Sequence, residues 1–231
     1  MTITKISSPV SEIIEETPTV RSFLFPMPPE FSFEPGQYVN ILAEIDGKIT
    51  RRSYSIARKV DHAIEITLNL VQNGLMSKHL HSMKLGDIVQ ITGPLGVFVL
   101  KKDSAQKDNT FIATGTGVTP FVAMIEKLLS ETRKNVTLFA GYKHEEEILF
   151  DDFFKELQKK HKNFNYHVAV SRDTDFKGEK HVQELMEKYL PSDFSGDVYL
   201  CGLFDMIKDV GLKLTKEWKL PKEKIIFERY D

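Results

Sequence analysis

A glycine-rich turn at residues 114–120 constrains the fold of this chain more than any other segment. The turn reads Thr-Gly-Thr-Gly-Val-Thr-Pro, follows the apolar run Phe111-Ile112-Ala113 and precedes an amphipathic helical pattern. Gly115 and Gly117 let the backbone turn sharply and approach a phosphate without a Cβ in the way, and Pro120 fixes φ for a first helical turn. A strand-to-helix turn in any α/β domain also favours Gly and Pro. The segment predicts an α/β domain whose turn, with the amides of the helix start, could hold a dinucleotide pyrophosphate.

The rest of the second half alternates β-rich and helical runs. Strands are predicted at 110–113, 136–142, 166–171, 198–201 and 224–230, and helices at 120–131, 150–160, 181–190 and 206–218. In the first of these helices the apolar residues follow the i, i+3, i+4, i+7 spacing of a stripe that packs on a sheet. The alternation predicts a doubly wound parallel sheet over residues 110–231.

The first half of the chain has a different pattern, in which short alternating segments are separated by turn residues. Strands are predicted at 20–25, 38–45, 54–57, 64–71, 88–91 and 97–100, and one helix at 76–83. This spacing predicts an antiparallel β-barrel over residues 1–103. The polar segment 101–109 has no apolar period and is expected to link the two domains.

Composition excludes several classes of protein. Lys plus Arg (31) nearly balances Asp plus Glu (33), so no overall field favours nucleic acid or an anionic membrane. No run approaches the roughly 18 apolar residues of a spanning helix, and the first residues lack the apolar segment of a signal peptide. The chain is therefore expected to be cytoplasmic, with no nucleic-acid partner and no membrane span.

Cysteine and histidine content limits the redox chemistry. Cys201 is the single cysteine, which excludes an intrachain disulfide and an iron–sulfur cluster held by four thiolates. His79 and His81 point to different sides of a helix, and no HExxH spacing occurs among the seven histidines. No metal site is predicted, and redox chemistry would have to use an organic cofactor.

Five short motifs occur in a fixed order along the chain. They are Arg52-Ser53-Tyr54-Ser55, Gly74-Leu75-Met76-Ser77, Gly93-Pro94-Leu95-Gly96, the turn at 114–120 and Cys201-Gly202-Leu203. In this order the set resembles the ferredoxin–NADP reductase family of flavoproteins, and the resemblance runs from Pro35-Gly36-Gln37-Tyr38 to Glu228-Arg229-Tyr230. It implies an FAD-binding barrel followed by an NADP(H)-binding α/β domain, with hydride passing from NADPH C4 to flavin N5 in the cleft between them. The Gly93 motif is interpreted as a tight turn without chemistry of its own.

The resemblance implies roles for residues on the flavin side. Tyr54 would lie flat on the isoalloxazine, Ser55 would lie within hydrogen-bonding reach of N5, and the planar guanidinium of Arg52 would bind flavin phosphates. The helix start at Ser77 would hold the FAD pyrophosphate, unless Ser77 is an ordinary helix cap. The expected flavin-binding residues are Arg52, Ser53, Tyr54, Ser55, Leu70, Val71, Gln72, Gly74, Met76 and Ser77.

The nicotinamide is expected at the end of the strand that carries Cys201, because ligands of open α/β sheets bind beyond the carboxyl ends of strands. By resemblance Cys201 lies beside C4 and Glu228 faces the flavin, so the expected catalytic residues are Ser55, Cys201 and Glu228. A lone cysteine is also a common inert core residue. Tyr230 would cover the flavin in the plant-type manner, but Asp231 follows it here, and a plain edge strand is the alternative.

Coenzyme choice depends on segments 169–172 and 177–183. Serine, arginine and lysine there suit a 2′-phosphate, whereas NADH enzymes tend to place an acid for the ribose hydroxyls. NADPH is favoured, and NADH stays open because the segment is one residue shorter than the plant-type site and has His181 in place of a stacking tyrosine. The expected nucleotide-binding residues are Thr116, Gly117, Thr119, Ser171, Arg172, Lys180, Gln183 and Tyr230. The charge run 143–147 is interpreted as a solvated face.

The sequence thus predicts an NADPH-dependent flavoprotein that passes electrons from FAD to a protein acceptor such as ferredoxin or flavodoxin. Three alternatives stay open: an NAD(P)H-dependent free-flavin or small-molecule reductase, the reductase component of an oxygenase system, and a non-enzymatic electron-relay subunit. Short motifs do not name the acceptor, because surface complementarity decides it.

Overall fold

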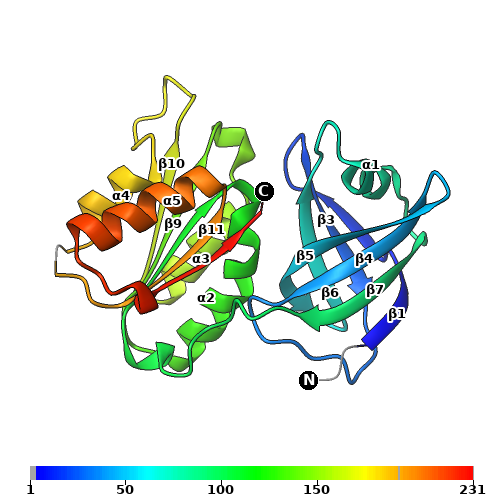
Figure 1. Cartoon of the computed structure of the whole chain (residues 1–231), viewed down its shortest axis with the longest axis horizontal. Coiled ribbons are helices and arrows are strands. Elements are labelled where there is room, and N and C mark those ends of the chain that lie inside the picture. The colour runs from blue at the N-terminus through cyan, green and yellow to red at the C-terminus, as the bar shows by residue number, and fades with distance from the viewer. Residues whose placement is uncertain (1–3, 192, 231) are drawn as a thin grey trace. The chain divides into compact units, whose positions relative to one another are not determined.

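The computed structural model describes residues 4–191 and 193–230. Within them the chain forms two compact units (Figure 1). The first contains the described residues up to Val99 together with Thr119–Met124, and the second contains Leu100–Val118 and the chain from Ile125 onward. Each unit has its own sheet and its own apolar core.

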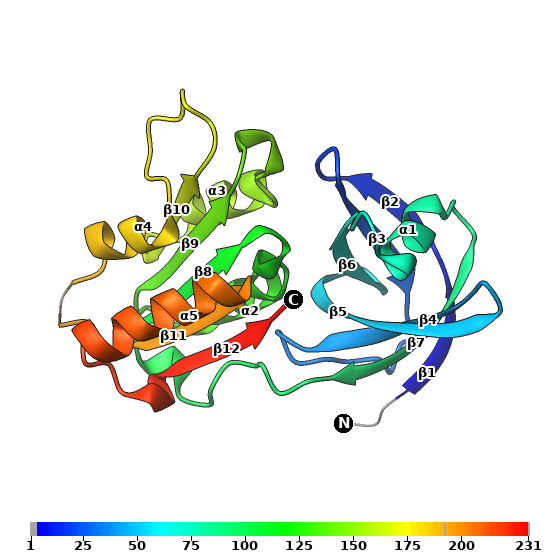
Figure 2. The same ribbon diagram turned by 45° about the horizontal axis from the view of Figure 1, so that its top comes forward.

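The first unit is a seven-stranded antiparallel sheet in the order β1-β7-β4-β5-β6-β3-β2, which curls into a half-barrel (Figure 2). Its elements are β1 (Thr4–Pro9), β2 (Glu12–Glu15), β3 (Val20–Pro26), β4 (Tyr38–Ile45), β5 (Lys48–Val60), β6 (Ala63–Asn69), α1 (Leu75–Ser82) and β7 (Ile88–Leu95). The long strand β5 pairs with β4 along its first part and with β6 along its second, past a register shift between Ile56 and Arg58. Alternate residues of these strands, such as Phe23, Ile41 and Ile66, fill the barrel core. The predicted antiparallel barrel is confirmed.

Three details of the first half differ from the sequence prediction. No strand was predicted for β1 and β2, whose short, polar sequences carry little apolar alternation. The strand predicted at 97–100 is wrong, because the chain leaves the sheet at Gly96, where φ is +103°, and Val97 is 93% exposed. Gly93 is part of β7 and not of a tight turn, and a Cβ there would lie 2.9 Å from Val39 of β4.

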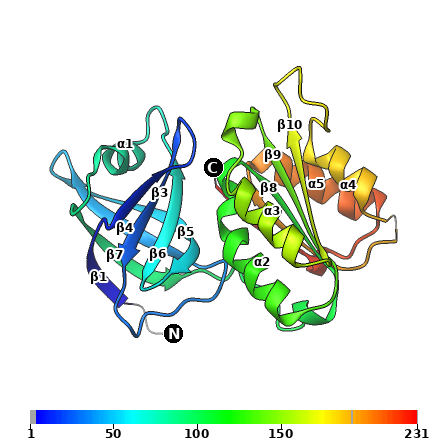
Figure 3. The ribbon, with the colours of Figure 1, turned by 180° about the vertical axis from the view of Figure 1, so that it is seen from behind.

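The second unit is a five-stranded parallel sheet in the order β10-β9-β8-β11-β12. Its strands are β8 (Asn109–Thr114), β9 (Val136–Tyr142), β10 (Phe164–Val170), β11 (Asp197–Gly202) and β12 (Ile225–Arg229). Its helices are α2 (Thr119–Glu131), α3 (Asp151–Lys160), α4 (Val182–Tyr189) and α5 (Phe204–Leu212), the last continued by a π-helical turn (Lys213–Glu217). The helices α4 and α5 cover one face (Figure 1), and α2 and α3 cover the other (Figure 3). The chain winds outward from β8 in both directions, so the doubly wound sheet is confirmed.

The segment 101–109, expected to be a linker, packs into the second unit. It contains a 3₁₀ turn (Ser104–Gln106), and the Ser104 hydroxyl lies 2.9 Å from the hydroxyl of Tyr199. Lys101 Nζ donates to the fully buried carboxylate of Asp197 at 3.0 Å, and Lys107 Nζ lies 3.4 Å from its other oxygen. These two cations neutralise a charge that burial would otherwise make unfavourable.

Among the described residues, no helix is long and apolar enough to cross a membrane. The same residues contain no group of three or more His, Cys, Asp or Glu side chains placed to hold a metal ion.

Candidate functional site

In the first unit, β5 carries the arginine–tyrosine–serine motif where it pairs with β4. Tyr54 lies opposite Val39 and packs at the edge of the barrel core, and burial raises the pKa of its phenol to about 12. Ser55 is buried, whereas the Arg52 side chain is exposed. The Ser53 hydroxyl donates to the side-chain oxygen of Asn40 at 2.8 Å. The motif therefore presents a neutral aromatic ring and an exposed guanidinium on the same strand.

The start of α1 is built around Ser77 and Gly74. The Ser77 hydroxyl accepts from the amide of Val71 at 3.1 Å and donates to the carbonyl of Gly74 at 3.1 Å. Ser77 is thus not the cap of α1: the N-cap is Gly74, which has no side chain to cap with. A Cβ at Gly74 would lie 2.5 Å from the Ser77 hydroxyl, so the fold requires glycine there.

This arrangement decides which groups near α1 can face a ligand. The side chains of Leu70, Val71 and Leu75 are exposed, and so is Gln72. Met76 lies in the barrel core, so only its backbone can contact a phosphate. The amides of the first helical turn have no partner within the helix, which makes this end a suitable place for an anion.

In the second unit, the turn between β8 and α2 forms a 3₁₀ helix (Gly115–Val118). Gly115 has a φ of +54°, a conformation that favours glycine. A Cβ at Gly117 would lie 2.4 Å from the carbonyl oxygen of Cys201, so Gly117 is needed for the close approach of this turn to β11. Thr116 is half-buried, and Thr119 is buried with no hydrogen-bond partner for its hydroxyl in the described part of the chain.

Cys201 and Glu228 lie side by side at the carboxyl ends of β11 and β12. These residues are paired across β11 and β12, and Cys201 is fully buried. Burial and the charge of Glu228 raise the pKa of the Cys201 thiol well above its usual range, and burial raises the pKa of Glu228 to about 7. The pairing continues past the strand, because the amide of Tyr230 donates to the carbonyl of Gly202 at 3.2 Å. The fully buried Cys201 and the half-buried Glu228 thus lie side by side at the carboxyl ends of the two strands.

The first predicted coenzyme segment, 169–172, lies at the end of β10, and the second, 177–183, lies in the loop that leads into α4. The amides of Ser171 and Arg172 donate to the carbonyls of Tyr142 and Lys143, at 3.0 and 2.9 Å. Arg172 is exposed. The Lys180 ammonium group, which was expected to bind the coenzyme, already has a protein partner. Its Nζ donates to the carbonyl of Asp173 at 2.6 Å. Gln183 and His181 lie at the start of α4, the first half-buried and the second exposed.

Hydrogen bonds between the loop that follows β9 and the loop that follows β10 were not predicted from the sequence. One carboxylate oxygen of Asp173 lies 2.6 Å from His144 Nδ1, and the other accepts from the amide of Glu145 at 2.6 Å. Both contacts hold the pKa of Asp173 below its usual range, with the Glu145 amide as the larger cause. The carboxylate of Glu147 also accepts from the amide of His144, so the charge run 143–147, exposed in part, is ordered by its own side chains.

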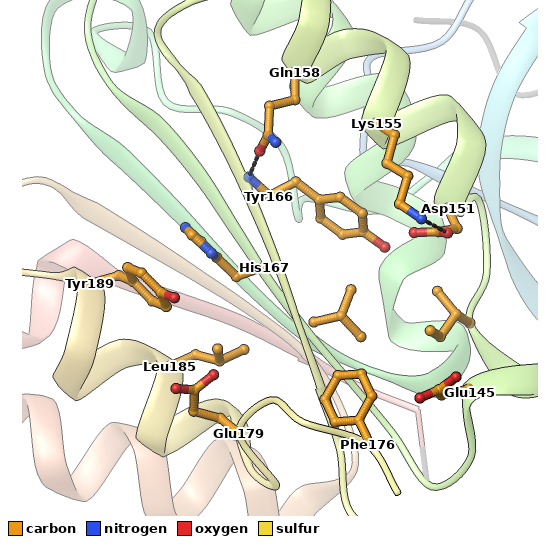
Figure 4. A pocket seen from close by; sticks show the side chains of 12 residues that line it. Glu145, Asp151, Lys155, Gln158, Tyr166, His167, Phe176, Glu179, Leu185 and Tyr189 are labelled. Atoms are coloured by element: carbon orange, nitrogen blue, oxygen red, sulfur yellow. Dashed lines mark hydrogen bonds and ion pairs between the residues drawn. The ribbon is translucent and has the colours of Figure 1, made fainter. Parts of the chain in front are cut away.

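Sequence reasoning also missed a hollow along the edge strand β10, with a volume of about 550 Å³ (Figure 4). It is lined by residues of α3, β10, α4 and the intervening loops, and none of the predicted site residues is among them. His167 and Tyr189 stack there with ring centroids 3.8 Å apart, and the Lys155–Asp151 ion pair lies near Tyr166 (Figure 4). These residues are scattered along the sequence, so no motif marks the hollow.

Comparisons with known proteins agree with this geometry. Residues 7–100 match the family of oxidoreductase FAD-binding domains, and residues 111–211 match the family of oxidoreductase NAD-binding domains. Ferredoxin–NADP reductase B of Sorangium cellulosum is 30% identical over 214 residues, which cover 87% of this chain and 86% of that protein. The chain belongs to the ferredoxin–NADP reductase superfamily.

Other members of the superfamily are similar over nearly the whole chain. The reductase component DmpP of phenol 2-monooxygenase from Pseudomonas sp. strain CF600 is 32% identical over 96% of this chain and 64% of its own length. The chain therefore spans less than two thirds of that relative. The cytochrome P450 reductase GcoB of Amycolatopsis has the same fold, with a TM-score of 0.88 and 25% identity over 98% of this chain and 70% of its own.

Family membership makes the chain an FAD- and NAD(P)-binding oxidoreductase. The chemical groups that each unit presents fit the cofactor expected there. In the first unit a neutral aromatic ring, an exposed guanidinium and the free amides of α1 suit a flavin nucleotide. In the second, a glycine turn that lies against the carboxyl end of β11 suits a pyridine nucleotide.

Proposed function

We propose that this chain is an NADPH-dependent reductase that passes electrons from bound FAD to a protein acceptor such as ferredoxin or flavodoxin. FAD would be held by residues 1–103 and NADP(H) by residues 110–231. The observation that carries the proposal is the in-register pair of Cys201 and Glu228 at the carboxyl ends of β11 and β12, where a parallel sheet binds its ligand. Bound FAD supplies the hydride acceptor and the electron store.

The chain's own residues would bind and orient the two cofactors. Tyr54 would stack on one face of the flavin and Ser55 would contact its N5. Cys201, protonated at neutral pH because of its burial, would pack beside the reacting carbon without introducing a charge. Glu228, with a pKa of about 7, would be able to donate or accept a hydrogen bond there. Such positioning contributes to the rate by holding the reacting atoms in line.

The choice of NADPH is supported by the ends of β9 and β10. Arg172 is exposed and can pair with a 2′-phosphate. The acid next to Arg172, Asp173, has both oxygens engaged by His144 and the Glu145 amide, so it is not free to bind ribose hydroxyls as in NADH enzymes.

The reductase component of an oxygenase system is the second candidate. It is favoured by the similarity to the phenol 2-monooxygenase reductase component, which spans 96% of this chain. The acceptor would then be another component of the oxygenase. Both candidates share the step from NAD(P)H to FAD and differ only in the surface that meets the acceptor.

Steady-state reduction of candidate acceptors by the purified, FAD-loaded protein tests the proposal. Ferredoxin, flavodoxin, an oxygenase component and free FMN would be compared, with NADPH or NADH as donor. The proposal expects efficient reduction of a protein acceptor, a flavin that stays bound during purification, and preference for NADPH. Rapid reduction of free FMN by a protein that purifies colourless would instead assign it to the free-flavin reductases.

A further inference from the structure

The edge strand β10 contains a residue whose backbone hydrogen-bonding groups are left open. In a parallel strand, every second residue points its N–H and C=O to the same side. The amide of Tyr166 points away from β9, because it donates to Gln158 Oε1 at 2.6 Å. The amide of Val170 points the same way and donates to the carbonyl of Glu179 at 3.1 Å. Val168 lies between them and so also points outward, and neither its N–H nor its C=O has a hydrogen-bond partner in the described part of the chain.

These open groups lie at the hollow along β10, which Val168 lines together with its neighbours Tyr166 and His167. An edge strand with open backbone groups can pair with a strand of another chain. Here the amides on either side are already bound by Gln158 and Glu179, so with these contacts in place an added strand could reach only one amide. The hollow therefore suits a small molecule better than an added strand.

The two open groups of Val168 define the hydrogen bonds that a ligand has to make. The N–H and C=O of one extended residue lie side by side and point in one direction. A ligand that binds both must present an acceptor and a donor next to each other in one plane. The amide of a ring lactam, as in a pyridone or a quinolone, has this arrangement, because its C=O accepts and the adjacent N–H donates. The strand edge is therefore complementary to a lactam.

The walls of the hollow suit a flat, apolar ring. Tyr166 packs against Phe154 of α3 with ring centroids 5.2 Å apart, whereas His167 stacks on Tyr189 of α4 (Figure 4). The two faces of the strand therefore both contribute aromatic side chains. Further apolar surface comes from Ile148, Phe176 and Leu185. The volume of about 550 Å³ lies within the usual range of small-molecule sites.

The charges around the hollow disfavour an anion. The described lining contains three carboxylates, Glu145, Asp151 and Glu179, and one lysine, Lys155. Lys155 is paired with Asp151, and Lys188, which lies outside the lining, is paired with Glu179. Burial lowers the pKa of His167, so its ring adds no positive charge at neutral pH. The excess is the single exposed carboxylate of Glu145, which repels an anion but is too exposed to hold an organic cation by itself.

We propose that the hollow along β10 is a binding site for an uncharged heteroaromatic lactam, whose C=O and N–H bind the N–H and C=O of Val168. The ring lies among the aromatic and aliphatic side chains that reach the strand edge from α3 and α4. The site is separate from the proposed coenzyme site, because none of the residues expected to bind FAD or NADP(H) lines the hollow. It therefore does not depend on the proposed function.

Calorimetric titration of the FAD-loaded protein with 2-quinolone and two analogues tests the lactam contact. The proposal predicts binding of 2-quinolone at submillimolar concentration, in the range expected for so small a ligand. N-methyl-2-quinolone lacks the donor and should bind on the order of tenfold more weakly, because the Val168 carbonyl loses its partner. The anion 2-quinolone-4-carboxylate should also bind more weakly. Absence of 2-quinolone binding, or equal affinity for 2-quinolone and its N-methyl analogue, would overturn the proposal.

Val168→Pro removes the same contact from the protein side. Proline lacks the amide hydrogen and is tolerated on an edge strand where the N–H faces outward. Val168→Ala is the matched control, because it shortens the side chain and keeps the amide. Circular dichroism and flavin content establish that both variants are folded and loaded. Val168→Pro should bind 2-quinolone on the order of tenfold more weakly than Val168→Ala, and equal affinities would contradict the proposal.

The amide signal of Val168 in ¹H–¹⁵N NMR spectra of the wild-type protein keeps the test decisive even if Val168→Pro does not fold. Its proton should shift downfield as 2-quinolone saturates the site, because the amide gains an acceptor. Saturating NADP⁺ should leave the affinity for 2-quinolone unchanged. A Val168 signal that does not move, or displacement of 2-quinolone by NADP⁺, would place the ligand elsewhere and overturn the proposal. Failure of the protein to reduce ferredoxin or flavodoxin would overturn only the proposed function.

Discussion

Cys201 and Glu228 lie opposite each other in the register of β11 and β12, and burial favours the neutral form of both side chains. The pKa of the thiol is raised well above its usual range, and that of the carboxyl group is raised to about 7. A thiol that stays protonated is a poor nucleophile. The Cys201 side chain at this strand end therefore packs against its neighbours and does not react with them. Under the proposed function, the pair would position a nicotinamide ring and would take no part in covalent chemistry.

Cys201→Ser separates positioning from core packing. If Cys201 lies beside the nicotinamide, flavin reduction by saturating NADPH should slow by between about tenfold and a hundredfold, because a small displacement of the reacting atoms is enough for such a loss. If Cys201 only packs in the core, the rate should hold and the melting temperature should drop, because the new hydroxyl is buried. Stopped-flow reduction and thermal melting on one sample read both quantities.

Glu228→Gln should stabilise the protein at alkaline pH. The folded-state pKa of Glu228 is raised from 4.5 to about 7, so the folded state binds more protons in that window and wild-type stability falls as pH rises through it. Since solvent screens part of the effect, we expect the variant to gain about 1 to 2 kcal/mol more at about pH 8 than at about pH 5. Urea unfolding at the two pH values measures this. A difference between variant and wild type that does not change with pH would contradict the burial of this charge.

Arg172→Ala should weaken NADP⁺ binding more than NAD⁺ binding, by about 1.5 to 3 kcal/mol, because a charged donor to the 2′-phosphate is lost. Lys162→Ala, which removes an exposed lysine between α3 and β10, is the control for a general loss of charge. Asp173→Asn should not weaken NAD⁺ selectively, because both carboxylate oxygens already have protein partners. Calorimetric titration with the two oxidised coenzymes gives the constants, and equal losses for both in Arg172→Ala would refute the NADPH assignment.

Tyr54→Ala should lower flavin retention while the barrel still folds, because Tyr54 lies at the edge of the core and not within it. Tyr54→Phe is the matched control and should retain FAD, since the ring is kept and the phenol is uncharged at neutral pH. The ratio of FAD to protein after purification is the measurement. Full occupancy in Tyr54→Ala would remove Tyr54 from the flavin site.

Elements with a strong apolar period were predictable from the sequence. The bounds of β4 and β9 match the prediction to the residue, since each is an apolar run with polar or turn residues at both ends. The edge strands β1 and β2 were missed because half of an edge strand faces solvent and carries polar residues. The strand predicted at 97–100 is wrong because the positive φ of Gly96, which ends β7, is invisible in a hydropathy pattern.

Contacts between distant segments could not be predicted. The sequence predicts that Gly117 lets the backbone approach a phosphate. In the structure, a Cβ at this position would clash with the backbone of Cys201. The engagement of Asp173 by His144 depends on two loops that the parallel sheet brings side by side. The contact between the hydroxyls of Ser22 and Thr67 likewise depends on the pairing of β3 with β6. Motifs point to candidate segments, but only the tertiary structure shows which side chains remain available.

Hydride transfer from the nicotinamide to the bound flavin is the central claim, and the isotope dependence of flavin reduction tests it most directly. The FAD-loaded protein would be mixed anaerobically with NADPH that carries deuterium on one face of C4 or on the other, and flavin bleaching would be followed by stopped flow. The account predicts reduction that slows for one labelled face and not for the other, because the strand-end site presents a single face of the ring. Failure of NADPH and NADH to reduce the flavin, or equal rates with both labelled forms and with unlabelled NADPH, would contradict it.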